Sequence, residues 1–182
     1  MLKQRISPIE LPYDPDIQSA FDRIMPPDVS PLILFRTLAR NPRVFHRFMA
    51  GGLLDKGAIS LREREIVINR ACARCGSEYE WGVHIAFFKD KAGLSDEQVR
   101  ATVLGDADDI CWQDRDRLLI RLVDTLHDTA RIDDALWEAL SSEFSDEQIL
   151  ELVVLTGLYH MVSFVTNGLK LPLETYGARF PA

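Results

Sequence analysis

Apolar residues recur with helical periodicity along most of the chain, and no segment alternates apolar and polar positions as a strand does. The clearest apolar stripe lies between Gln113 and Thr129 and is formed by Leu118, Leu119, Leu122, Val123 and Leu126. Hairpin dipeptides between alternating runs are also missing. The pattern therefore predicts an all-α bundle of about eight helices.

Serine residues mark most of the predicted helix starts, because a serine side chain can accept a hydrogen bond from the first free backbone amides of a helix. Ser60 with Glu63, and Ser77 with Glu80, each have the spacing of a capping box. The predicted helices run from Asp16 to Ile24, Ser30 to about Arg40, Val44 to Ala50, Ser60 to about Cys75, Ser77 to about Ala92, a short stretch from Ser95, Gln113 to Thr129, Asp133 to Ser142, and Ser145 to about Asn167.

Residues 1–30 are predicted to form an arm and a short helix that precede the bundle. Residues 1–14 contain Pro8 and Pro12 and predict an extended arm. A short helix follows and stops at Pro26 and Pro27. With 182 residues the chain is expected to form one domain, with residues 1–30 as its arm and first helix.

The final predicted helix is apolar on nearly every face between Ile149 and Val165. A membrane span is one interpretation, but Glu151 and His160 lie within the segment and no positively charged loop flanks it. A central core helix or a subunit-contact helix fits better. This helix supports the expectation of a homo-oligomer, because one chain can hardly cover it on all sides.

Composition and charge narrow the class of protein further. The formal net charge of −7 disfavours binding to nucleic acid or to an anionic membrane surface. The N-terminus has no basic segment followed by an apolar run, so we expect a cytoplasmic protein. Three cysteines, an odd number, fit a reducing compartment.

The segment from Leu61 to His84 holds the strongest candidate for chemistry. Gly76 interrupts one helix, and Ser77 opens the next. On that second helix Glu80 and His84 are four residues apart and share a face. A carboxylate beside an imidazole fixes the ring tautomer and raises its basicity, as general acid/base catalysis requires. The break at Gly76 should also fold the first helix back, so that Glu65 approaches His84.

The same residues resemble the carboxymuconolactone decarboxylase and alkylhydroperoxidase D-like superfamily. Its signature is a Glu followed about a dozen residues later by C-x-x-C-x-x-x-H. Aligning the signature histidine with His84 places the two cysteines at Ser77 and Glu80, and the upstream Glu at Glu65. The sequence is similar to the decarboxylase-like branch, in which the cysteines are replaced. The resemblance extends from about Leu32 to Glu174.

The resemblance implies a small-molecule enzyme that assembles as a dimer, trimer or hexamer. It favours His84, Glu80 and Glu65 as catalytic residues, with Ser77, Tyr79 and Trp81 as substrate-binding residues. Each has a simpler interpretation as well: His84 as a core histidine with its hydrogen bonds satisfied, Ser77 and Glu80 as helix caps, Glu65 as part of a solvated charged run, and the aromatic residues as core packing.

Cys72 and Cys75 form a C-x-x-C pair five residues before the signature positions. They end a helix, so they lack the N-terminal dipole that lowers a thiol pKa, and we expect packing thiols. A zinc site at this pair would need two further ligands, of which His84 is one and no second is evident. No metal site and no cofactor are therefore predicted. The other candidates are interpreted structurally: Cys111 and His160 as core residues, Asn167 as a helix end, and His127 as a positive imidazole at a helix C-terminus.

Three functions remain open at this point. The first is cofactor-free acid/base chemistry, a decarboxylation or proton transfer, on a small carboxylated or lactone-type substrate. The second is a thiol peroxidase, for which only Cys72 and Cys75 are available. The third is a non-catalytic oligomeric protein that binds a small ligand.

Overall fold

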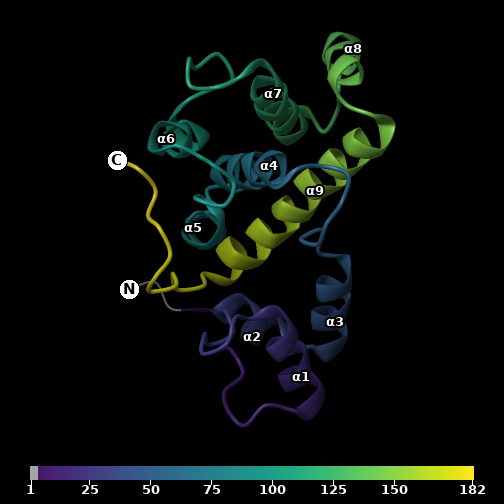
Figure 1. Cartoon of the computed structure of the whole chain (residues 1–182). Helices are drawn as coiled ribbons and strands as arrows, with labels where there is room; N and C mark the ends of the chain where they lie inside the picture. The colour runs from purple at the N-terminus through teal and green to yellow at the C-terminus, as the bar shows by residue number, and fades with distance from the viewer. Residues whose placement is uncertain (1–3) are drawn as a thin grey trace.

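The computed structural model describes residues 4–182 and contains nine α-helices in that range, eight of them longer than six residues. The predicted all-α bundle is confirmed (Figure 1). The helices are α1 (Pro15–Ile24), α2 (Ile33–Leu38), α3 (Pro42–Gly51), α4 (Leu61–Arg74), α5 (Glu78–Phe88), α6 (Asp96–Leu104), α7 (Asp114–Thr129), α8 (Asp134–Glu143) and α9 (Asp146–Leu169).

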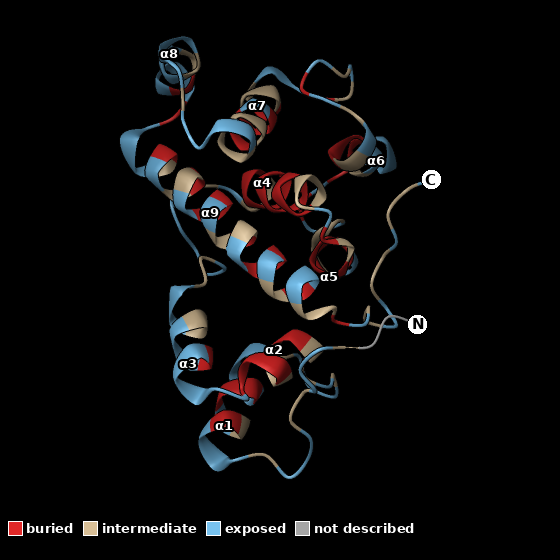
Figure 2. Ribbon diagram, turned by 180° about the vertical axis from the view of Figure 1, so that it is seen from behind, coloured by how far each residue is buried: buried red, intermediate tan, exposed pale blue. Residues whose placement is uncertain are grey.

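Helix α4 is the centre of the larger group of helices and contacts α5, α6, α7 and α9 (Figure 2). Its residues from Glu63 to Cys72 are all buried, including several charged side chains. Ten consecutive buried positions leave no solvated face, so the polar groups of α4 must bind other protein groups. Charged side chains of α4 accordingly form ion pairs with other side chains, such as Arg64 with Glu65 and Arg70 with Asp124.

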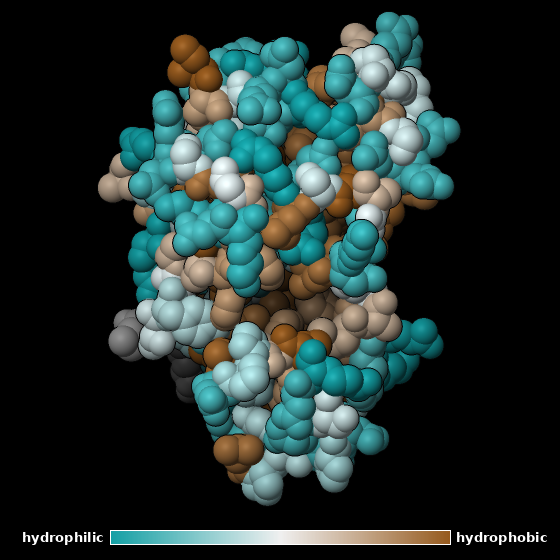
Figure 3. Space-filling view, viewed as in Figure 1, coloured by the Kyte–Doolittle hydropathy of each residue, from teal (hydrophilic) through white to brown (hydrophobic). Residues whose placement is uncertain are grey.

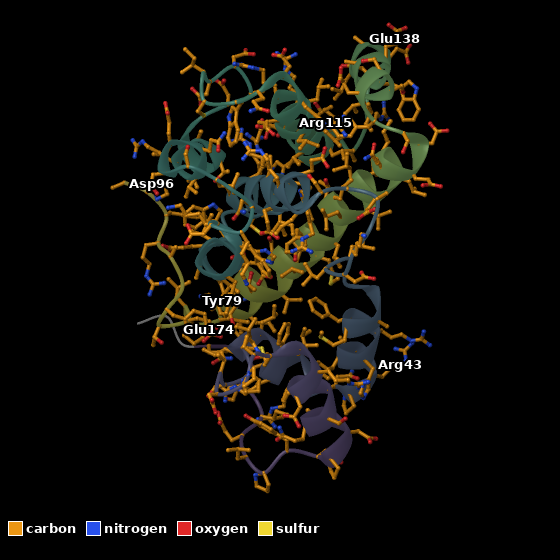
Figure 4. The ribbon with its side chains drawn as sticks, viewed as in Figure 1. Arg43, Tyr79, Asp96, Arg115, Glu138 and Glu174 are labelled. Atoms are coloured by element: carbon orange, nitrogen blue, oxygen red, sulfur yellow. The ribbon has the colours of Figure 1, made fainter. Side chains whose placement is uncertain are left out.

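Helices α1, α2 and α3 form a smaller unit at one end of the molecule (Figure 1). Tyr79 of α5 and Glu174 of the C-terminal segment attach this unit to the larger group (Figure 4). The Tyr79 hydroxyl donates to Glu174 Oε1 at 2.6 Å, and the same oxygen accepts from the Ile33 amide, also at 2.6 Å. The Leu34 amide lies 3.0 Å from the Tyr79 hydroxyl. The single-domain organisation stays a prediction, and these contacts support it.

The chain after α9 runs back along α5. Ala178 donates its amide to the Gly82 carbonyl at 3.0 Å, and a Cβ at Gly82 would lie 2.3 Å from the Ala178 carbonyl oxygen. Glycine is therefore needed at position 82 for this close approach. Phe180 packs edge-on against Trp81, with ring centroids 5.2 Å apart.

Serine caps were predicted correctly at α4 and α9 but not everywhere. Ser60 and Ser145 each complete a capping box. The predicted start at Ser30 is wrong, because α2 begins at Ile33 with Leu32 as its N-cap and without a side-chain cap. The predicted end near Ala92 is also late, since α5 ends at Phe88 and turns follow as far as Gly93.

Helix α9 is long and apolar enough to cross a membrane by length and composition, yet 44% of its most apolar window is buried against the rest of the chain. It contacts α4, α5 and α8, as a core helix does. Its exposed apolar side chains lie at spacings of four, seven and three residues, which place them on one face: Leu150, Val154, Met161 and Phe164. Such a stripe is typical of helix pairing. Homo-oligomerisation stays a prediction, for which sedimentation is the direct measurement.

Candidate active site

The turn between α4 and α5 brings the predicted catalytic residues together. Gly76 has φ +62°, and the Ser77 amide donates to the Cys72 carbonyl at 2.8 Å, which ends α4 in a Schellman motif. The chain reverses here, and Glu65 Oε2 lies 2.8 Å from His84 Nδ1. One straight helix would separate these residues by ~28 Å. The predicted contact between Glu65 and His84 is confirmed.

Glu65 is fully buried and binds a cation at each carboxylate oxygen. Arg64 Nη2 lies 3.0 Å from Glu65 Oε1, and His84 Nδ1 contacts Glu65 Oε2. Arg64 also donates from Nη1 to the Leu54 carbonyl at 2.6 Å, so its guanidinium is held from two sides. The interpretation of Glu65 as a solvated surface charge is therefore wrong.

The other ring nitrogen of His84 faces two acceptors. Nε2 lies 2.9 Å from the hydroxyl oxygen of Tyr159 on α9 and 3.5 Å from Glu80 Oε1. The ring itself is only 3% exposed. Tyr159 is wholly buried, and this burial, together with Glu80, raises the pKa of its hydroxyl well above the ordinary value, so it remains a neutral phenol.

The surrounding carboxylates decide the protonation state of His84. Burial acts to lower its pKa, but the charge and hydrogen bond of Glu65, and then those of Glu80, outweigh burial and raise the pKa of His84 to about 9. The imidazolium form also balances the formal charges of the cluster, because Arg64 and His84 then face Glu65 and Glu80. At neutral pH both ring nitrogens carry protons, and Nε2–H is available for donation.

One carboxylate oxygen of Glu80 lacks a hydrogen-bond partner among the described residues. This atom, Oε2, is buried. The predicted capping role of Glu80 is wrong, since α5 has no side-chain cap at Ser77. A buried carboxylate oxygen without a partner is unfavourable unless a ligand or water donates to it.

Glu80 and His84 lie in the wall of a pocket of about 290 Å³ between α5 and the α1–α3 unit. Figure 3 shows apolar side chains gathered in a hollow at the waist of the molecule, between these two parts. Lys91 supplies a positive charge at the pocket, with Nζ 5.6 Å from the centroid of the Phe88 ring. The remaining lining residues are apolar: Ile24, Met25, Pro26, Leu32, Phe35, Leu54, Val83, Phe87 and Phe88.

The three predicted substrate-binding residues do not line this pocket. Ser77 is fully buried and lies 2.9 Å from the Thr166 hydroxyl of α9, instead of capping α5. Trp81 is buried and donates from Nε1 to the hydroxyl of Thr102 at 3.0 Å. Tyr79 binds Glu174. In this structure all three hold helices together, so the pocket wall comes from other residues.

Cys72 and Cys75 lie at the end of α4, as predicted. Cys72 is fully buried, and burial followed by the charge of Glu80 raises the pKa of its thiol well above the ordinary value. The prediction of a positive His127 at a helix end is wrong in its charge. Burial, followed by the nearby charge of Arg74, lowers the pKa of His127.

Sequence reasoning missed Arg64 and Tyr159. Arg64 stands next to Glu65 in a run of charges that is typical of a solvated helix face, and it carries no signal of burial. Tyr159 is 75 positions from His84 along the chain, in a helix whose apolar composition predicts core packing. Only the fold brings these side chains to the cluster.

Residues 42–119 match the Carboxymuconolactone decarboxylase family, and Glu65, Glu80 and His84 all fall within the matched segment. The match is shorter than the predicted span from Leu32 to Glu174. A search of curated proteins found no match.

Several solved structures share the fold at low sequence identity. A peroxidase-related protein from Silicibacter sp. TM1040 is 20% identical, with a TM-score of 0.79 over 100% of both chains. The debrominase Bmp8 in complex with 2,3,4-tribromopyrrole is 12% identical, with a TM-score of 0.79 over 96% of this chain and 94% of that one. An alkylhydroperoxidase AhpD core protein from Ralstonia eutropha JMP134 is 19% identical, with a TM-score of 0.68 over 95% of each chain.

Proposed function

We propose that this chain, whose residues 42–119 match the Carboxymuconolactone decarboxylase family, is a cofactor-free acid/base enzyme of the decarboxylase-like branch. Its substrate is a small carboxylated or lactone-type molecule. The observation that carries the proposal is that one pocket wall holds both His84, 2.8 Å from Glu65, and Glu80, whose Oε2 has no partner within residues 4–182.

The pocket supports a substrate with an apolar body and one anionic group. Its walls are mainly aliphatic and aromatic, and its volume of about 290 Å³ is at the small end of ligand sites. Lys91 is the lining residue that can hold a carboxylate through its charge. Glu80 Oε2 can accept a hydrogen bond from a hydroxyl or amide of the substrate, or from a bound water.

His84 is the proton donor in this proposal. During decarboxylation the bond to the carboxylate carbon breaks, carbon dioxide leaves, and the electron pair passes into an enolate. The enolate carbon then takes the proton from His84 Nε2, and the neutral imidazole regains a proton from solvent before the next turnover. Glu65 and Arg64 act as positioning residues, because they hold the ring and maintain its charge.

Substrate turnover in deuterated buffer tests the proposal. Carboxylated lactones of five or six ring atoms, and matched analogues without the carboxylate, are incubated with the enzyme and followed by NMR. We expect loss of carbon dioxide from the carboxylated members, with one solvent deuterium in each product. Lys91→Gln should raise KM with little change in kcat, whereas Lys89→Gln, which removes a surface ion pair with Asp96, should change neither.

Two outcomes would contradict the proposal. Tight binding of the same compounds without any turnover would favour a non-catalytic ligand-binding protein. Deuterium incorporation that proceeds equally well in the wild type and in His84→Gln would remove the assigned proton donor.

The thiol peroxidase alternative predicts a different response. The resemblance places the redox cysteines at Ser77 and Glu80, which cannot form a dithiol pair, and the Cys72 thiol is buried with a raised pKa. Cys72→Ala should therefore leave lactone turnover unchanged and lower the free energy of unfolding by about 1 kcal/mol through lost packing. Stopped-flow peroxide consumption measures the alternative: rapid consumption by the wild type that disappears in Cys72→Ala would favour a peroxidase.

A further inference from the structure

A second cluster of side chains lies where three helices meet, apart from the pocket. Cys75 follows the last residue of α4, His127 is in the last turn of α7, and His160 is in the middle of α9. One potential ligand atom from each residue lies within 4.8 Å of the other two. His127 Nδ1 is 2.9 Å from His160 Nε2 and 3.9 Å from Cys75 Sγ.

A backbone hydrogen bond fixes the orientation of the His160 ring. Its Nδ1 atom donates to the Thr156 carbonyl at 2.8 Å, one turn earlier on α9. The proton therefore resides on Nδ1, and the lone pair of Nε2 points at His127 and Cys75. Histidines that bind metals commonly have this arrangement, in which the second ring nitrogen donates to a backbone carbonyl.

The spacing of the three atoms fits a small tetrahedral ion. With bonds of ~2.0–2.1 Å to nitrogen and ~2.3 Å to sulfur, ligand atoms around zinc are ~3.3–3.6 Å apart. The observed separations of 2.9 and 3.9 Å fall on either side of this range, so shifts of a few tenths of an ångström would complete the site. A thiolate with two imidazoles is a donor set that suits zinc.

The surroundings permit a cation. All three side chains are partly buried, so an ion can enter from solvent and still lose part of its water shell. Arg74 is the neighbouring positive group, and its guanidinium is paired with Asp128 and lies 3.6 Å from Asp124. These carboxylates offset the repulsion between Arg74 and a bound cation.

We propose that Cys75, His127 and His160 bind one Zn²⁺ ion, with a water molecule as the fourth ligand. On binding, the Cys75 thiol releases its proton to solvent, and His127 moves its remaining proton from Nδ1 to Nε2. No electron is transferred. This proposal differs from the zinc site considered from the sequence, since Cys72 and His84 are not ligands and Cys75 is joined by histidines of α7 and α9.

Zinc at this position would join the C-terminal ends of α4 and α7 to the middle of α9, next to the turn at Gly76. The ion should therefore raise the thermal stability of the protein, because it binds the folded arrangement and the three ligands are far apart in the unfolded chain. This stabilisation does not depend on the proposed catalytic activity.

Metal binding is measured on the full chain after treatment with a chelator. Zinc chloride is titrated against a chromophoric chelator, and cobalt(II) chloride is followed by absorption. We expect one equivalent of zinc per chain, a rise in Tm, and a thiolate-to-cobalt band in the near ultraviolet. Cys75→Ser should abolish the cobalt band, and His127→Gln and His160→Gln should each weaken zinc binding by at least about tenfold.

The chain provides matched controls for these variants. Cys111→Ser removes another partly buried thiol, and His46→Gln removes an exposed histidine; both should bind zinc like the wild type. Circular dichroism of each variant verifies that it is folded. Binding of less than about half an equivalent by the wild type, or equal affinity in the wild type and all three site variants, would overturn the proposal.

Discussion

Replacing His84 with glutamine is expected to lower kcat by about 10²–10⁴-fold, the range that one general acid or base contributes. Glutamine retains a polar side chain of similar length but cannot carry the transferable proton. The circular dichroism spectrum should remain helical, because His84 is one residue in a bundle held mainly by apolar packing. The measurement is steady-state turnover of the carboxylated substrate, with His46→Gln as the control for loss of a histidine at an exposed position.

The pH profile separates a proton donor from a merely structural histidine. Because Glu65 and Glu80 outweigh burial and raise the pKa of His84 to about 9, wild-type turnover should be maintained through neutral pH and fall as the pH passes about 9. His84→Gln should retain no such alkaline limb in its residual activity. A variant with kcat within about twofold of the wild type would exclude His84 as the proton donor.

The active cluster could be predicted where its chemistry is local in sequence. Gly76 interrupts the apolar pattern, and this one residue is enough to predict the turn between α4 and α5. Once the two helices lie side by side, the contact between Glu65 and His84 follows from the spacing of these residues around the turn. Ser60 and Ser145 cap their helices as predicted because nothing else competes for their hydroxyl groups.

Ser77 illustrates why the same reasoning fails elsewhere. Its sequence context is that of a helix cap, but the Thr166 hydroxyl of α9 lies 2.9 Å away and forms the hydrogen bond instead. That partner is 89 residues distant along the chain, and no local pattern indicates it. Glu80 is thereby free of a capping role, and its side chain lies in the pocket wall.

The pocket and the second cluster depend on tertiary contacts of this kind. The pocket forms between α5 and a unit whose first helices were predicted merely as an arm and short segments. His127 and His160 each have a sufficient local explanation, as a helix end and as a core residue. Only the packing of α7 against α4, and of α9 against α4, places both histidines beside Cys75.

Replacing Glu65 with glutamine is expected to destabilise the protein by about 3–5 kcal/mol at pH 6, as removal of one partner from a buried ion pair does. Arg64 and His84 would then be buried without their shared carboxylate. The loss should depend on pH. The pKa of His84 is raised in the folded protein to about 9, above its value of ~6.5 in the unfolded chain.

The protonated His84 therefore contributes stability that is fully present below about pH 6.5 and is lost as the pH rises through about 9. A difference of this size corresponds to about 3 kcal/mol. Urea unfolding of the wild type and Glu65→Gln between pH 6 and 10 should give curves that converge toward alkaline pH, with a remaining gap from the pair of Glu65 with Arg64. Glu10→Gln, which removes an exposed pair with Arg36, should change stability by less than about 1 kcal/mol at every pH. Parallel curves for the wild type and Glu65→Gln would show that Glu65 does not set the charge of His84.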